Sequence, residues 1–189
     1  MTALNTTNLG DVFNDSAYAE LALVDCRNWE NPVTHTYREL NSAANSFAVR
    51  LTAEGLRQGD VVAILSSNRA GFMIAFLGIL RAGLIAVPIN YKFSKEIIQF
   101  IFADANVSLA ICDAERAANL ETNIQIMNFD RDSMKALDNK TYQKPFHIYD
   151  ASKSDVAMIL YTSGSTGRPK GVPLTHAGHL WALRARAGN

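Results

Sequence analysis

Apolar residues follow two alternating spacings along the chain, one typical of helices and the other of buried strands. Thr36 and Glu39 match a capping box, and the apolar positions between 40 and 51 recur at helical intervals. The β-branched, apolar run 61–67 that comes next predicts a strand covered on both faces. The regular part of the chain is therefore expected to open with a helix and a buried strand.

The same alternation continues toward the C-terminus. Asn68 is the predicted N-cap of a helix that Gly83 ends, Ser94 caps the next helix, and Thr175 caps the last one. The predicted helices are 69–82, 95–105, 114–120 and 176–187, and the predicted strands are 84–90, 108–113, 124–129 and 156–163, with an extended piece at 172–174.

This order of elements predicts the fold. Strands that alternate with helices indicate an α/β domain with a mostly parallel sheet, helices on both faces and right-handed crossovers. Residues 130–154 interrupt the alternation; they are polar, with one helical turn predicted at 134–137, and we expect a surface connector. Ligands of such sheets bind outside the carboxyl ends of the strands, so a functional site is expected there.

Length and composition are those of a globular protein. The 189 residues correspond to one domain, two at most, and 48% of them are apolar. The 18 basic and 18 acidic side chains balance, which argues against a nucleic-acid binder driven by a basic face. Cys26 and Cys112 are expected to be reduced thiols in a cytosolic protein.

No transmembrane segment is predicted. The N-terminus lacks a basic start followed by an apolar run, so a secretory signal peptide is not expected. The most apolar stretch, 70–80, is 11 residues long and is followed by Arg81, whereas a membrane-spanning helix needs about 20 apolar residues. We therefore expect a cytoplasmic protein in which 70–80 is a buried helix.

The chemistry of the chain is concentrated after the strand predicted at 156–163. This segment combines glycines, hydroxyl side chains and two cations: Thr162, Ser163, Gly164, Ser165, Thr166, Gly167, Arg168, Lys170 and Gly171. Glycine lets the backbone approach an anion closely, each hydroxyl can donate to a phosphate oxygen, and Lys170 supplies a mobile positive charge. The segment is predicted to bind phosphate, because a plain Gly/Ser turn between two strands needs neither four hydroxyls nor a following lysine.

Two other nucleotide-binding motifs do not fit this segment. A Walker A loop has Gly before its Lys and Ser or Thr after it, whereas Pro169 and Gly171 flank Lys170. A dinucleotide fingerprint, G-x-G-x-x-G, does not occur in it either. The histidines of the chain show no spacing typical of metal ligands, so no metal site is predicted among these residues.

The segment YTSGSTGRPKGV at 161–172 closely resembles the signature loop of the adenylate-forming enzymes. That superfamily holds acyl-CoA synthetases, adenylation domains of peptide synthetases and luciferases. The resemblance continues over most of the chain, in YREL at 37–40, GDVVA at 59–63, LGILRAG at 77–83, VPIN at 87–90 and VPLTH at 172–176.

The resemblance implies a two-step reaction and its ligands. A fatty or aryl carboxylate attacks the α-phosphorus of ATP to give an acyl-adenylate and pyrophosphate, and a thiol, usually coenzyme A, then displaces AMP. In such enzymes the loop holds the β- and γ-phosphates, and Mg²⁺ is bound mostly by later segments. By the same resemblance residues 162–168 and Lys170 bind ATP, Lys170 also acts in catalysis, and His176 lies near the acyl pocket; the alternative for His176 is a first-turn helix residue without a ligand.

Members of the superfamily are longer than this chain. Their later part carries a Tyr-Gly-x-Thr-Glu segment, a ribose-binding Asp, a hinge and a small C-terminal domain with the adenylation lysine. We therefore expect residues 1–189 to be the N-terminal portion of the large domain of an acyl-CoA synthetase, inactive alone and prone to self-association. An adenylation domain of a peptide synthetase and a non-catalytic stand-alone fragment remain the alternatives, and Pro169 and Gly171 disfavour a P-loop NTPase.

Overall fold

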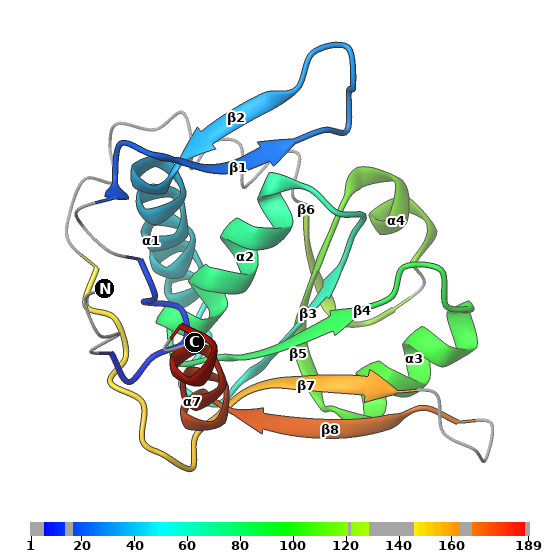
Figure 1. Cartoon of the computed structure of the whole chain (residues 1–189). Helices are drawn as coiled ribbons and strands as arrows, with labels where there is room; N and C mark the ends of the chain where they lie inside the picture. The colour runs from blue at the N-terminus through cyan, green and yellow to red at the C-terminus, as the bar shows by residue number, and fades with distance from the viewer. Residues whose placement is uncertain (1–5, 14–16, 121, 129–145, 163–167, 188–189) are drawn as a thin grey trace.

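The computed structural model describes residues 6–13, 17–120, 122–128, 146–162 and 168–187 (Figure 1). In chain order the elements are β1 (Leu21–Asp25), β2 (Val33–Thr36), α1 (Tyr37–Ala53), β3 (Val61–Leu65), α2 (Ala70–Arg81), β4 (Ile85–Ile89), α3 (Lys95–Asp104), β5 (Val107–Cys112), α4 (Ala114–Asn119), β6 (Gln125–Asn128), β7 (Val156–Thr162), β8 (Lys170–Thr175) and α7 (His176–Ala187).

The central sheet has six strands in the order β6-β5-β3-β4-β7-β8. All neighbouring strands are parallel except β8, which pairs with β7 in the antiparallel sense at the edge. This confirms the predicted α/β fold with a mostly parallel sheet. The extended piece predicted at 172–174 is a six-residue strand, β8, and a separate antiparallel hairpin, β1–β2, was not predicted.

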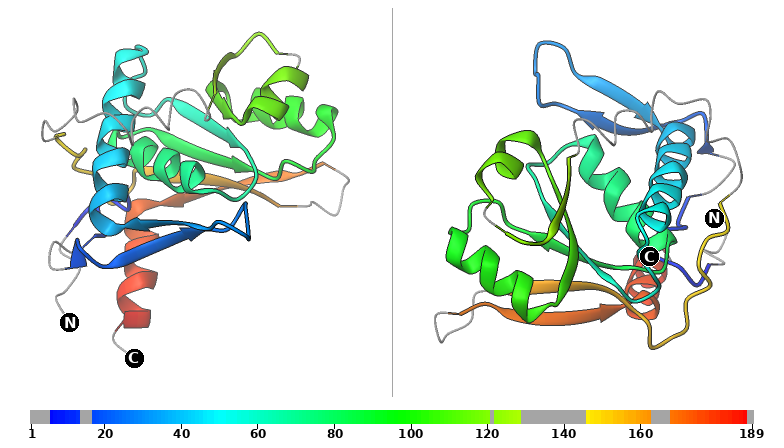
Figure 2. Two further views of the ribbon diagram at one scale, coloured as in Figure 1. Left: turned by 90° about the horizontal axis from the view of Figure 1, so that it is seen from above. Right: turned by 180° about the vertical axis from the view of Figure 1, so that it is seen from behind.

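Helices cover both faces of the sheet, as Figure 2 shows from two further directions. β3 is buried along its whole length, and its residues alternate between two apolar clusters. Val62 and Ile64 pack in the cluster that contains α1 and α2, whereas Ala63 and Leu65 pack in the cluster of α3. The chain leaves β3 toward one face and β4 toward the other, which creates a topological switch point between these two strands.

Three of the predicted helix caps are present. The Thr36 hydroxyl accepts the N–H of Glu39, and the Glu39 carboxylate accepts the N–H of Thr36, which completes the capping box of α1. Ser94 and Thr175 each accept a hydrogen bond from the N–H three residues further on, at the starts of α3 and α7. These bonds satisfy N–H groups that have no partner within the first turn of a helix.

The predicted start of α2 is wrong by one residue, and its cap comes from elsewhere. The N-cap is Arg69, not Asn68, and Arg69 makes no side-chain capping bond. Instead the Asp25 carboxylate, at the end of β1, accepts the N–H of Ala70 at 3.0 Å. Burial by itself would raise the pKa of Asp25, but hydrogen bonds from Ala70 and Arg27 outweigh it and the pKa is lowered. A cap from a residue 45 positions away cannot be predicted from local sequence.

The apolar stretch 70–80 is α2, which is buried on most sides as predicted. Across the described ranges we find no helix with both the length and the apolar character that a membrane crossing requires. The predicted connector, 130–154, is described only from residue 146 onward, and the turn predicted at 134–137 lies outside the described residues.

Arg81, the last residue of α2, is fully buried and joins three parts of the chain. Its guanidinium donates to the backbone oxygens of Gly10 and Asn41, at 2.8 and 2.9 Å, and to the side chain of Asn45 at 2.7 Å. Burial lowers the pKa of Arg81 to about 10. The hydrogen bonds of the guanidinium offset part of the free-energy cost of burying its charge. They also hold the N-terminal segment against α1 and α2.

Candidate phosphate-binding site

The ends of β7 and β8 carry two of the predicted phosphate-binding residues. β7 ends at Thr162 and β8 begins at Lys170, and the two residues lie directly opposite each other across the antiparallel pair. Both are exposed at the carboxyl end of β7, the edge at which parallel sheets bind ligands (Figure 1). The residues between these stems, Ser163, Gly164, Ser165, Thr166 and Gly167, lie outside the described part of the chain.

Arg168 lies against α3. The central carbon of its guanidinium is 5.5 Å from the centre of the Phe100 ring, within the range of a cation–π contact. Pro169 beside it is buried. The two residues line a cleft of about 210 Å³ together with Glu96, Ile97 and Phe100. The structure therefore brings Arg168 to the face of α3 that carries Glu96 and Phe100.

Tyr161 contacts the same helix from β7. Its hydroxyl donates to the Asp104 carboxylate at 2.6 Å, and burial together with this acceptor raises the pKa of Tyr161. Gly171 is the cross-strand partner of Tyr161. A Cβ at Gly171 would come within 3.0 Å of Tyr161 Cζ, so the tyrosine ring occupies the space that a side chain on β8 would need.

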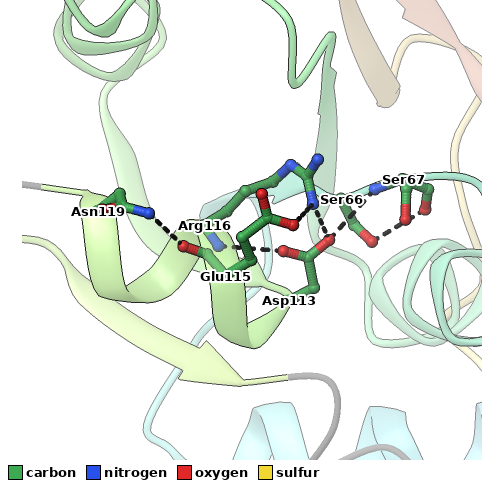
Figure 3. Close-up of polar contacts among 6 residues, drawn as sticks. All are labelled: Ser66, Ser67, Asp113, Glu115, Arg116 and Asn119. Carbon is green, nitrogen blue, oxygen red and sulfur yellow. Dashed lines mark hydrogen bonds and ion pairs between the residues drawn. The ribbon is translucent and has the colours of Figure 1, made fainter.

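A cluster of hydrogen-bonded residues around Asp113 and Arg116 also lies at the carboxyl edge of the sheet (Figure 3). Asp113 follows β5 and caps α4 by accepting the N–H of Arg116 at 3.2 Å; its carboxylate also pairs with the Arg116 guanidinium. The N–H of Ser67, in the loop after β3, donates to Asp113 at 3.4 Å. The Arg116 guanidinium lies 4.2 Å from the centre of the Tyr91 ring, in the segment after β4.

This cluster joins the segments that follow β3, β4 and β5, on either side of the switch point. Sequence reasoning missed it, although Asp113 directly before a predicted helix was a signal for an N-cap. Its charges are largely balanced by the Asp113–Arg116 pair. Its visible role is to hold the three segments in place.

His176 lies at the other end of the strands, near the amino end of β7. β8 runs antiparallel to β7, so the start of α7 is near the start of β7, about 20 Å from Thr162 by the rise of the strand. The side chain is buried, and its Nδ1 accepts the N–H of Leu9 at 3.0 Å. Burial lowers the pKa of His176, although the charge of Asp155 opposes this. The structure does not bring His176 together with the loop stems at Thr162 and Lys170.

The remaining candidates for chemistry are few. Cys112 is fully buried, and burial raises the pKa of its thiol to about 12, which makes it unreactive. Among the residues that the structure describes, no three His, Cys, Asp or Glu side chains are placed to hold a metal ion.

A mostly parallel sheet, with a Gly/Ser/Thr-rich segment between β7 and β8 that ends at Lys170, is the arrangement of an adenylate-forming, nucleotide-binding domain. The chain belongs to the family of AMP-binding enzymes, which matches residues 15–188. This confirms the resemblance to adenylate-forming enzymes that the sequence motifs indicated.

Individual relatives agree with this assignment. The chain is 32% identical over 144 residues to surfactin synthase subunit 2 of Bacillus subtilis (strain 168), over 75% of this chain and 4% of that protein. Its structure is similar to ATP-bound MatB from Rhodopseudomonas palustris, with a TM-score of 0.73 and 27% identity, over 90% of this chain and 35% of that one. It is also similar to a Mycobacterium tuberculosis fatty acyl CoA synthetase, with a TM-score of 0.63 and 31% identity, over 76% of this chain and 30% of that one.

Proposed function

We propose that this chain supplies the ATP-phosphate-binding part of a ligase that activates a carboxylic acid as an acyl-adenylate and then passes the acyl group to a thiol. The observation that carries the proposal is the pair Thr162 and Lys170, exposed at the carboxyl edge of the sheet in a chain of the AMP-binding family. The similarity to an ATP-bound structure supports ATP as the nucleotide. The chain spans only a small part of its relatives, so the activity of the whole protein is part of the proposal.

In the first step, a carboxylate oxygen bonds to the α-phosphorus of ATP, and the bond from that phosphorus to its bridging oxygen breaks. The leaving pyrophosphate takes the electron pair and gains negative charge. Lys170 stabilises this charge, and Thr162 donates its hydroxyl to a phosphate oxygen. In the second step, a thiol attacks the acyl carbon and AMP leaves. Mg²⁺, held mostly by later segments of the whole protein, would neutralise negative charge on the phosphates of ATP.

Two kinds of thiol acceptor are candidates. Coenzyme A, with a fatty or aryl acid as substrate, is the first, and the similarity to a fatty acyl CoA synthetase supports it. A carrier-bound thiol, which the adenylation domain of a peptide synthetase loads, is the second, and the 32% identity to surfactin synthase subunit 2 favours it. Either reaction suits the cytoplasm, where ATP and reduced thiols are available.

ATP–pyrophosphate exchange by the full-length protein that contains this chain tests the proposal. A panel of fatty, aryl and amino acids should include at least one that raises exchange well above the acid-free blank, and Lys170→Ala should lower it. Release of AMP on addition of coenzyme A would then separate the first acceptor from the second. Absence of acid-dependent exchange across the panel would contradict adenylate formation.

A further inference from the structure

We propose that α3 anchors both stems of the phosphate-binding loop through one stripe of side chains, and that Arg168 is a positioning residue held by Phe100 instead of a phosphate ligand. The stripe consists of Glu96, Phe100 and Asp104. The inference rests on the proposed function of the loop, because it assigns how that loop is held for binding.

The stripe follows from helix geometry. Residues four apart lie on the same face of an α-helix, so Glu96, Phe100 and Asp104 succeed one another along α3. The two stems of the loop meet this one face. Tyr161, from β7, donates to Asp104 at 2.6 Å, and Arg168, before β8, lies 5.5 Å from the Phe100 ring.

The charges around Arg168 favour α3 over a bound phosphate. Arg168 and Glu96 line the same cleft, and a carboxylate there attracts the guanidinium and repels an anion. Pro169 in this cleft is buried and fixes the backbone direction after Arg168. Lys170, which is exposed as Arg168 is, lies opposite Thr162 and is left to meet the phosphates.

Anchored stems lower the cost of binding. Stem residues that are already held in place lose less conformational freedom on binding an anion than stem residues that are free. Loss of the Phe100 contact should therefore weaken anion binding without removing a charge from the site. Loss of a phosphate ligand should weaken binding and also reduce its dependence on salt, because fewer ionic contacts are then screened.

The test measures pyrophosphate binding to the chain by calorimetry at two salt concentrations. Phe100→Leu and Arg168→Ala should each raise the Kd about threefold, in line with an exposed cation–π contact, and the double variant should show no further loss. Phe100→Trp retains an aromatic face and should bind like the wild type. Phe76→Leu, a partly buried phenylalanine on the other face of the sheet, is the matched control and should leave the Kd unchanged.

The salt dependence separates the two roles of Arg168. Arg168→Ala should keep the wild-type salt dependence, whereas Lys170→Ala should reduce it. The proposal is overturned if Arg168→Ala reduces the salt dependence as Lys170→Ala does while Phe100→Leu binds normally, because Arg168 would then be a phosphate ligand.

Proteolysis tests the anchor independently of phosphate binding. Trypsin can cleave between Lys170 and Gly171, and release of the stem should raise the cleavage rate in Phe100→Leu and in Asp104→Ala but not in Phe76→Leu. If the wild type fails to bind pyrophosphate but the variants show these cleavage rates, the proposed function is contradicted and the anchor is supported. Equal cleavage rates in all the variants would overturn the anchor itself.

Discussion

His176 shows how a single buried side chain can connect distant parts of this fold. The imidazole is almost fully buried and accepts the N–H of Leu9, so it must be neutral to serve as the acceptor. Arg184 of α7 donates to the oxygen of Thr6, which adds a second bond between α7 and the N-terminal segment. The protonation state of His176 therefore bears on whether this segment stays attached.

The free energy of unfolding should decrease as the pH is lowered, because of His176. Burial lowers the pKa of His176 in the folded state, with the nearby Asp155 opposing and His179 adding to the shift. The unfolded chain therefore binds the proton first, and stability present above a pH of about 6.5 is lost as the pH falls through that value toward the lower folded pKa.

His176→Asn keeps an oxygen acceptor for Leu9 but does not titrate. Urea unfolding at pH 7.5 and at pH 5.5 should show a smaller loss of stability in this variant than in the wild type. His147→Asn, at an exposed position, is the control and should keep the wild-type difference. An unchanged difference in His176→Asn would show that the imidazole does not drive the pH response.

At the scale of elements, the buried strands and their helices could be predicted because each has its own apolar run and stop signals. The stretch from β3 to β5 is of this kind. The β1–β2 hairpin could not, because its strands are short and mostly exposed, with Leu21 and Val33 more than half accessible. The start of α2 was misplaced for a related reason, since its cap is Asp25 on that same unpredicted hairpin.

Removal of the Asp25 carboxylate should loosen the hairpin and α2 together. Asp25→Ala leaves the N–H of Ala70 without its partner and should cost about 1–2 kcal/mol of stability, the usual value of a lost helix cap. Asp25→Asn retains an oxygen acceptor and should cost less. Urea denaturation of both variants measures the difference, and equal stability of Asp25→Ala and the wild type would rule out the capping role.

At the scale of the whole molecule, several apolar side chains are exposed on β7, β8 and α7. Leu160 and Val172 are cross-strand neighbours, and Trp181 is 71% accessible on α7. Pro173 lies in the edge strand β8 and has no N–H to offer to another strand, so contacts between chains should involve side chains more than strand pairing.

We expect residues 1–189 to self-associate through these exposed apolar side chains. Light scattering should show a mass that rises with protein concentration, and Trp181→Gln should lower it, because less apolar area is then available for burial. Lys153→Gln, on an exposed polar segment, should have no effect. A monomer across the whole concentration range would contradict the expectation.

The sequence also predicts a candidate site, but not the contacts that surround it. The loop residues are consecutive, so Thr162 and Lys170 could be predicted as phosphate-binding residues from the motif alone. The contacts of Arg168 with Phe100 and of Tyr161 with Asp104 join α3 to β7 and β8 across more than 50 positions, and only the fold brings these residues together. The position of His176 near the amino end of β7 likewise depends on β8 being antiparallel to β7.

The most direct test of the phosphate-binding assignment is a chemical-shift titration of the chain with pyrophosphate and, separately, with adenosine. Pyrophosphate should shift the amides of the loop stems, Thr162 and Lys170, and adenosine should leave them unchanged. Lys170→Ala should weaken pyrophosphate binding about fivefold, because an exposed charge contributes about 1 kcal/mol. If adenosine shifts the spectrum while pyrophosphate leaves these amides unmoved, the loop does not bind the phosphates of ATP.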